Sequence, residues 1–420
     1  MIELETNLKL ADWTYRIPES EIRRLVRERP KYYFAGGLPG NIPQNIMGTI
    51  LQDIVDEIRV LDNYGNLDLL NYSSSEGHEQ LRDVLSQRLH RFDNISGIDK
   101  SDLLITQGAQ QSIHLTFMSL LNRGDIILIP SPCYLGIFGQ LEMLDITTIS
   151  IPTDKDGLIP EGIEKALEFS TQILKKKPKA IYLPSFADNP TGISHSWKRK
   201  KDLYDLLVAW NVLIIEDNAY REIKFDDKKY YPIKSLDIDN EHVLYLRTTS
   251  KEAAVLRIGY TIMPEFIQST IIKTKGFFDL CSSLLNQEIA YRYYRDHIEA
   301  TLPTLRMRYK TQADAMKKAI DDYLPGSRTD PKGGFFIWQT LDTSMDANKL
   351  LESALKSGII FVPGDGFYPY NGLFVDDSYR MITRRIPKKN EIRLSFSSMK
   401  PEEITKGIEE LSLVIESATD

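Results

Sequence analysis

A set of chemically versatile residues lies between positions 189 and 257. It comprises Asn189 in DNPTG, Asp217 and Tyr220 in EDNAY, the pair Ser250-Lys251, and Arg257 in LRIGY. A lysine amine forms a Schiff base with an aldehyde, and a carboxylate pairs with a pyridine nitrogen. Amide, hydroxyl and cationic groups bind a phenolic oxygen and a phosphate. The set therefore predicts a pyridoxal phosphate site.

The elements that must position these residues are short apolar runs typical of buried strands. Asp217 ends the run VLIIED, and Lys251 lies just after the run VLYLR. The carboxyl ends of parallel strands meet at one edge of a sheet, which is where ligands bind in such folds. Taken singly, Asp217 could cap the next helix and Asn189 could start a turn without any chemical role. The order of the residues, rather than any single one, supports the prediction.

A second group of residues precedes this set in the sequence and could bind the phosphate and the aromatic ring of the same cofactor. The run LLIT leads into Gly108, Ala109 and Gln110, at the start of a helical pattern. Backbone N–H groups and the dipole at a helix N-terminus bind phosphate. Tyr134, after the next apolar run, could lie on the cofactor ring or simply pack in the core.

The alternation of apolar runs and helical patterns predicts an α/β fold with a mainly parallel, seven-stranded sheet and a smaller α+β domain. We expect an N-terminal arm with part of the small domain at 1–45, a large cofactor-binding domain at 46–295, and a C-terminal small domain at 296–420. The expected strands of the large sheet are 103–106, 125–130, 146–152, 180–184, 212–217, 243–247 and 257–263.

Composition narrows the class of protein. A length of 420 residues exceeds what one hydrophobic core usually spans, so two domains are expected. The net charge of −7 argues against a general affinity for nucleic acid, and no apolar run is long enough to span a membrane. Two cysteines and six scattered histidines show no metal-ligand spacing, so no metal is expected. These features favour a cytoplasmic location.

Further motifs give the chain a family resemblance over nearly its whole length. FAGGLPG (34–40), YSSSEGHEQLR (72–82) and ITQGAQQSIHL (105–115) accompany the residues above. In combination they resemble the fold-type I, pyridoxal phosphate-dependent aminotransferases of class I/II. Within this family, the chain most resembles the branch that contains the 2-aminoadipate aminotransferases and the catalytic domains of the MocR regulators. Only about 30 residues precede FAGG, so a regulator with a DNA-binding extension is not expected.

The resemblance implies a role for each matching position. Lys251 would form the Schiff base and move the proton, and Asp217 would pair with the pyridine nitrogen. Asn189 and Tyr220 would bind the phenolic oxygen, and Tyr134 would stack on the ring. Arg393 in EIRLSFS would bind the substrate α-carboxylate, with Gly37 and Asn189 beside the substrate. The phosphate would be surrounded by Gly108, Ala109, Gln110, Thr248, Ser250, Arg257 and, from the other subunit of a homodimer, Tyr72.

Transamination between an L-amino acid and a 2-oxo acid is the leading expectation. The chain departs from the family pattern in SKEAAVLRIGY, where Lys251 and Arg257 are six positions apart, in Asp188 before Asn189, and in an insertion near 370–390. The altered lysine loop motivates one alternative: a lyase that eliminates a β- or γ-substituent of a functionalised amino acid, or a cyclase that acts on such an amino acid. A ligand sensor without catalysis is a third reading, against which the presence of Lys251, Asp217 and Arg393 argues. The insertion could contact a polar or charged substrate side chain or form a surface flap.

Overall fold

The computed structural model describes residues 9–15, 30–60, 69, 71–376, 378–382 and 388–419. The helix-like stretch SEIRRLVRER (20–29) lies outside these ranges. A large mixed sheet forms the centre of the molecule, with the strand order β15-β14-β4-β3-β6-β7-β8-β9-β2 and β5 paired to β4. Its strands are β2 (Leu103–Thr106), β3 (Ile126–Ser131), β4 (Thr147–Asp154), β5 (Gly157–Leu158), β6 (Ala180–Leu183), β7 (Leu213–Asp217), β8 (Val243–Thr248), β9 (Gly259–Ile262), β14 (Leu373–Val375) and β15 (Met381–Ile382).

The seven predicted strands are all present, as β2, β3, β4, β6, β7, β8 and β9. Among the described residues the sheet has ten strands rather than seven, because β5, β14 and β15 extend it. Neighbours from β4 to β8 pair in parallel, whereas β9 runs antiparallel to both β8 and β2. The carboxyl ends of β2, β3, β6, β7 and β8 therefore share one edge of the sheet.

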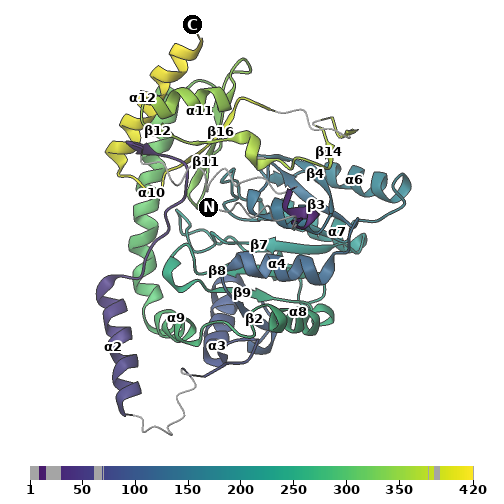
Figure 1. The fold of residues 1–420 in the computed structure, drawn as a ribbon, viewed down its shortest axis with the longest axis vertical. Helices are drawn as coiled ribbons and strands as arrows, with labels where there is room; N and C mark the ends of the chain where they lie inside the picture. The colour runs from purple at the N-terminus through teal and green to yellow at the C-terminus, as the bar shows by residue number, and fades with distance from the viewer. Residues whose placement is uncertain are drawn as a thin grey trace, which may run out of the picture.

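Helices cover both faces of this sheet (Figure 1). One apolar core joins it to α4, α5 and α8, and another joins it to α6 and α7. A third core packs α2, α3 and α9 beside β2 and β9. The bounds are α2 (Gln44–Val60), α3 (Glu79–Arg88), α4 (Ala109–Leu120), α5 (Phe138–Met143), α6 (Pro160–Gln172), α7 (Trp197–Ala209), α8 (Glu265–Phe278) and α9 (Leu284–Asp296).

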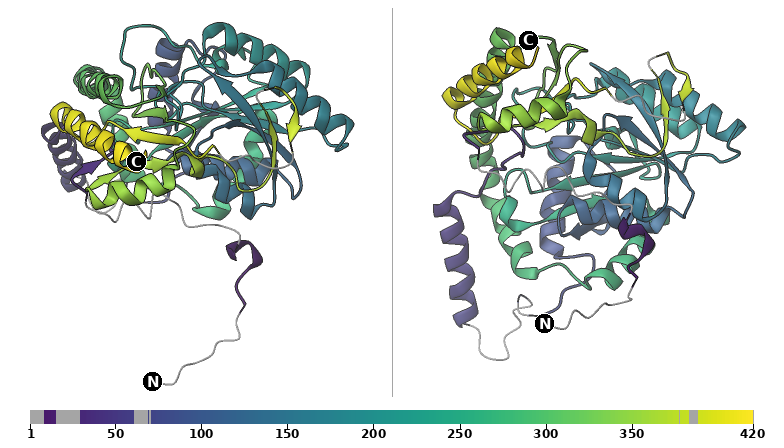
Figure 2. Two further views of the ribbon diagram at one scale, coloured as in Figure 1. Left: turned by 90° about the horizontal axis from the view of Figure 1, so that it is seen from above. Right: turned by 45° about the horizontal axis from the view of Figure 1, so that its top comes forward.

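A smaller unit has its own core, built from a four-stranded antiparallel sheet and three helices. Its N-terminal strand β1 (Tyr32–Tyr33) pairs with β12 (Ile359–Ile360), so the N-terminal arm joins the C-terminal part of the chain. Figure 2 shows this unit to one side of the large sheet. The domain boundaries given above stay a prediction. The other elements of this unit are α10 (Ile298–Tyr323), β10 (Ser327–Arg328), β11 (Phe336–Thr340), α11 (Ala347–Lys356), β13 (Val362–Pro363), β16 (Glu391–Ser395) and α12 (Pro401–Thr419).

Short helical turns connect the main elements and complete the chain path. They are η1 (Asp12–Tyr15), η3 (Leu89–Asp93), η4 (Lys100–Asp102), η5 (Leu135–Ile137), η6 (Ile233–Leu236), η7 (Ala254–Leu256) and η8 (Gly364–Phe367). None of the helices in the described ranges is long and apolar enough to cross a membrane.

Candidate active site

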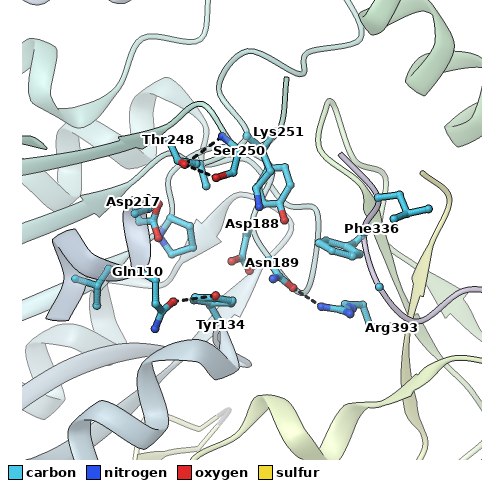
Figure 3. A pocket seen from close by; sticks show the side chains of 18 of the residues that line it. Gln110, Tyr134, Asp188, Asn189, Asp217, Thr248, Ser250, Lys251, Phe336 and Arg393 are labelled. Atoms are coloured by element: carbon cyan, nitrogen blue, oxygen red, sulfur yellow. Dashed lines mark hydrogen bonds between the residues drawn. The ribbon is translucent and has the colours of Figure 1, made fainter. Parts of the chain in front are cut away.

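A cavity of about 570 Å³ lies at the carboxyl edge of the large sheet, where the small unit approaches it. Most of the predicted site residues line it, and Figure 3 shows their side chains around one space. Gly108 lies immediately before the lining residue Ala109. Tyr72 does not line the cavity, and its side chain is 83% exposed. The predicted residues in the lining are Gly37, Ala109, Gln110, Tyr134, Asn189, Asp217, Tyr220, Thr248, Ser250, Lys251, Arg257 and Arg393.

Lys251 supplies the cavity with a primary amine, because its loop begins where β8 ends. Its Nζ lies 4.8 Å from the centroid of the Tyr220 ring. Burial lowers the pKa of Lys251, while Tyr134 and Asp217 oppose that shift. A lowered pKa leaves more of the amine unprotonated, which is the form that reacts with a carbonyl.

Asp217 ends β7 and turns its carboxylate toward the cavity. Tyr182, on β6, donates a hydrogen bond of 2.7 Å to Oδ2. Oδ1 is buried and has no hydrogen-bond partner among the described residues. Burial raises the pKa of Asp217, and the bonds to Tyr182 and the charge of Lys251 oppose the rise. A buried acceptor without a partner is costly, so Oδ1 is suited to a ligand that brings an N–H donor.

The corner at the start of α4 combines a cation, two hydroxyl groups and a helix N-terminus. Arg257 Nη1 donates to Ser250 Oγ at 2.9 Å, and Thr248 Oγ1 donates to the same oxygen at 2.9 Å. Gly108 precedes the helix with a φ of +79°, and a Cβ there would lie 2.8 Å from Arg257 Nη2. Glycine therefore allows the guanidinium to approach the helix N-terminus closely. The corner has the donors and the positive potential that a phosphate requires.

Arg393 forms the opposite wall, on β16, and its side chain is fully buried. Its Nη1 donates a hydrogen bond of 2.8 Å to Oδ1 of Asn189, and its Nη2 donates one to the carbonyl oxygen of Ala35. The guanidinium lies 4.1 Å from the ring centroid of Phe336 and 4.8 Å from that of Phe367. Burial lowers the pKa of Arg393 to about 10, so it stays cationic at neutral pH.

The residues present fit pyridoxal phosphate. A reactive amine, an unpartnered carboxylate oxygen and a phosphate corner surround one cavity, and Tyr134 and Tyr220 line its walls. The Nε atom of Arg393 is a further buried donor without a partner in the described ranges, which suits an anionic substrate group beside the cofactor. No cluster of metal-ligating side chains occurs among the described residues.

The sequence did not assign a role to several residues of the lining. Tyr33, Leu38 and Phe336 line the substrate side of the cavity, and Asp188 and Tyr182 lie in its lining near Asp217. Tyr182 lies in the expected strand 180–184 and Phe336 in the apolar run GGFFIWQTL, so neither position carries a signal of its own for ligand binding. Gly37, which the sequence did predict, is explained by close packing in the structure, because a Cβ there would lie 2.8 Å from the Phe335 ring.

The insertion near 370–390 does not line the cavity in its described part. Instead, β14 pairs in parallel with β4, through Leu373 opposite Ile149, and β15 pairs with β14. Val375 is buried in the core beneath α6. The sequence suggested either a loop that contacts the substrate side chain or a surface flap. The described residues of the insertion form neither, because they extend the large sheet.

Known proteins resemble this chain over most of its length. A family model described as aminotransferase class I and II matches residues 46–411. The aromatic-amino-acid aminotransferase 1 of Thermococcus litoralis is 31% identical over 94% of this chain and 90% of its own. The mitochondrial kynurenine/alpha-aminoadipate aminotransferase of Rattus norvegicus is 30% identical over 83% of each chain. The crystal structure of Pyrococcus horikoshii kynurenine aminotransferase in complex with PMP superposes with a TM-score of 0.86, at 30% identity over 98% of each chain.

Proposed function

Because the chain belongs to the family of class I and II aminotransferases, we propose that it transfers the amino group of an L-amino acid with a bulky apolar or aromatic side chain to a 2-oxo acid. It is an aminotransferase that uses pyridoxal phosphate. Relatives and structural neighbours named as aminotransferases favour this activity over the elimination or cyclisation that the rebuilt lysine loop suggested. The observation that carries the proposal is the grouping of Lys251, Asp217 and Arg393 around one cavity.

The residues divide the work of binding and proton transfer. Pyridoxal phosphate, when bound, supplies an electron-accepting ring and a carrier for the amino group. Asp217 would keep the ring nitrogen protonated, and the corner formed by Ser250, Arg257 and the start of α4 would hold the phosphate. Lys251 would hold the cofactor and move a proton at the substrate's α-carbon. These roles are consistent with the unpartnered Oδ1 of Asp217 and with the lowered pKa of Lys251.

Asn189, Tyr220 and Arg393 would orient the two small molecules. Arg393 offers a planar fork that matches a carboxylate, and Asn189 holds this fork through the bond to Nη1. Tyr220 lies edge-on to Phe335 and Phe336, which fixes its ring at the cavity wall. Its hydroxyl group would donate to the phenolic oxygen of the cofactor.

The substrate side chain would lie against an apolar wall. Tyr33, Leu38 and Phe336 line this side, and the cationic residues of the described lining are Lys251, Arg257 and Arg393. Those three are already assigned to the cofactor and the α-carboxylate. A second substrate carboxylate would therefore find no cation from the described part of this chain, which favours an aromatic or apolar donor. The relative named for aromatic amino acids supports this choice.

A homodimer would complete the site. Large apolar side chains are exposed around the end of α8 and the start of α9, where Phe277 is 94% exposed and Leu280 is 53% exposed. Tyr72 lies near this region, because Ser75 donates to the carbonyl oxygen of Leu280 at 2.7 Å. Exposed apolar patches of this kind mark protein interfaces. We propose that a second copy covers this face and that Tyr72 reaches the partner's phosphate corner. A cytoplasmic role in amino acid metabolism, including biosynthesis, is the setting we propose.

The experiment that tests the function follows the absorbance of cofactor-loaded protein mixed with single amino acids and no oxo acid. We expect one 2-oxo acid per site, and faster conversion with L-phenylalanine and L-leucine than with L-aspartate and L-2-aminoadipate. The variant Lys251→Ala should lose about 10²–10⁴-fold in rate, the usual contribution of a positioned proton-transfer group. Repeated turnovers with loss of a side-chain fragment would instead indicate a lyase, and a preference for the dicarboxylic substrates would contradict the assigned side-chain class.

A further inference from the structure

Asp188 is a second carboxylate in the lining of the same cavity as Asp217. It lies in the loop that follows β6, directly before Asn189, and it is 6% exposed. Its Oδ2 accepts a hydrogen bond of 2.9 Å from the hydroxyl group of Thr191. Its Oδ1 is buried and has no hydrogen-bond partner among the described residues. Figure 3 shows Asp188 between Asp217 and Asn189.

The surroundings of Asp188 contain no cation to pair with it in the described part of the chain. The titratable groups that act on it or feel its charge are Asp217 at the end of β7, Tyr220 in the turn after it, and Cys133 after β3. Burial, reinforced by the negative charge of Asp217, raises the pKa of Asp188 to about 7, although Thr191 opposes the rise. An unpaired charge in an apolar site is costly, and two such charges repel each other.

We propose that Asp188 is a positioning residue, a second carboxyl group of the cavity whose charge controls how strongly Asp217 holds the protonated ring nitrogen of the cofactor. The inference rests on the role proposed for Asp217. When Asp188 is protonated, the cavity carries the negative charge of Asp217 alone. When it ionises near neutral pH, the added negative charge favours the protonated form of the ring nitrogen that Asp217 would hold. The charge acts through a low local dielectric, so it is felt without direct contact.

The test compares wild type with Asp188→Asn, which keeps the size of the side chain and an oxygen for Thr191 but removes the charge. The pH midpoint at which the absorbance of the bound cofactor changes should fall by about one unit, the shift typical of losing a nearby charge. Thr191→Val keeps the carboxyl group but removes the hydroxyl donor of Thr191, so Asp188 should ionise at higher pH and the midpoint should move in the same direction by less. Asp239→Asn, at the opposite edge of the sheet, is the matched control and should leave the midpoint unchanged.

A second readout uses the cofactor-free protein. A folded-state pKa above the unfolded value means that the stability contributed by protonated Asp188 is full below about pH 4 and is lost as pH rises through about 7. Asp188→Asn should therefore raise the melting temperature of the cofactor-free protein more at pH 8 than at pH 5. This result does not depend on any turnover.

The outcomes separate this inference from the proposed function. If wild type binds pyridoxal phosphate and titrates, and Asp188→Asn shows the same midpoint, the inference is wrong while the function stands. An unchanged midpoint combined with a raised KM for the amino acid would also overturn it, because Asp188 would then contact substrate instead. If Asp188→Asn does not fold, Thr191→Val decides the matter through the same midpoint. Failure of wild type to bind the cofactor would contradict the proposed function itself.

Discussion

Oδ1 of Asn189 accepts a hydrogen bond of 2.8 Å from Nη1 of Arg393, although the two residues are 204 positions apart. Asn189 follows β6 of the large sheet, and Arg393 lies on β16 of the smaller one. The bond therefore joins the cofactor side of the cavity to the side that would bind the substrate carboxylate. Because the carbonyl oxygen of Ala35 holds the other terminal nitrogen, the guanidinium plane is fixed before any substrate arrives.

This arrangement predicts the effect of Arg393→Lys. An ammonium group cannot bond to Asn189, to Ala35 and to a carboxylate in one plane, so the variant should lose binding of the substrate without losing the cofactor. We expect kcat/KM to fall by about 30- to 100-fold, equivalent to about 2–3 kcal/mol, with most of the change in KM. Steady-state kinetics measures the loss, and the absorbance of the bound cofactor should stay as in wild type. Arg123→Lys, on an 84% exposed side chain, is the control. Equal kinetics in Arg393→Lys and wild type would contradict the assigned role.

Gly108 and Gly124 offer a matched pair for the phosphate corner. Their φ angles are +79° and +73°, so an alanine at either site bears backbone strain, and the strain is severe at Gly108, where ψ is 165°. Only at position 108 would the new Cβ meet Arg257, whereas position 124 has nothing within 4 Å. Gly108→Ala should therefore raise the Kd for pyridoxal phosphate by about tenfold or more, a loss of at least about 1.4 kcal/mol, because Arg257 is displaced.

Equilibrium titration with cofactor measures this difference, and Gly124→Ala should keep the wild-type Kd. If both variants bind the cofactor equally well, Arg257 and the start of α4 do not hold the phosphate. If both lose stability but not affinity, the strain alone accounts for the change.

The apolar face near α8 and α9 gives a prediction about assembly. Phe277→Asp places a charge on a residue that is 94% exposed in one copy, so it should not harm the fold of a single chain. In a dimer the same charge would be buried without a partner, which is strongly unfavourable. We expect the variant to sediment as a monomer where wild type sediments as a dimer, and to lose activity because Tyr72 no longer reaches the second site. Ile173→Asp, on a side chain that is 64% exposed at the end of α6, should remain dimeric. A monomeric, active wild type would disprove the proposed interface.

The parts of the fold that the sequence predicted are those with strong local patterns. The seven core strands are continuous apolar runs between turn residues, so each was detectable by itself. β14 and β15 were not, because Leu373–Val375 and Met381–Ile382 are short and gain their order from pairing with β4. The same holds for β1, which consists of two residues paired with a strand more than 300 positions away.

The site divides in the same way. Asn189 and Lys251 come after strands, and Asp217 ends one. Charged and amide side chains are uncommon at the ends of buried apolar strands, so the order of these residues predicted that they meet at one edge of the sheet. The contact of Phe336 with Arg393 depends on the register between β11 and β16, in which Phe336 lies opposite Ser395, and no local pattern encodes that register. Asp188 was visible as a departure in sequence, but its burial without a partner for Oδ1 could be learned only from the structure. Tyr72 stays a prediction, because its proposed contact lies in the other subunit.

His195 provides a test of stability that is independent of turnover. Its ring is buried beside Gly157, and Nε2 accepts a hydrogen bond of 3.0 Å from the backbone N–H of Leu158. Burial, with further help from Lys200 and Arg199, lowers the pKa of His195 to about 3. In the unfolded chain a histidine takes up its proton near pH 6.5, whereas the folded protein resists protonation down to about pH 3. The stability that neutral His195 contributes is therefore complete above about pH 6.5 and decreases as the pH falls toward 3.

His195→Gln removes this titration and keeps an oxygen that can accept from Leu158. The free energy of unfolding of wild type should fall relative to the variant by about 1 kcal/mol per pH unit below pH 6, because one extra proton binds the unfolded chain. Denaturant unfolding at pH 7, 6 and 5 measures the difference. At pH 7 the wild type should be the more stable of the two, since its ring fills the space beside Gly157. Gln87→Asn, at an exposed position of α3 without a titratable group, is the control and should parallel wild type. Parallel pH profiles for wild type and His195→Gln would mean that the buried ring takes up its proton at the same pH in the folded protein as in the unfolded chain, which would contradict the prediction.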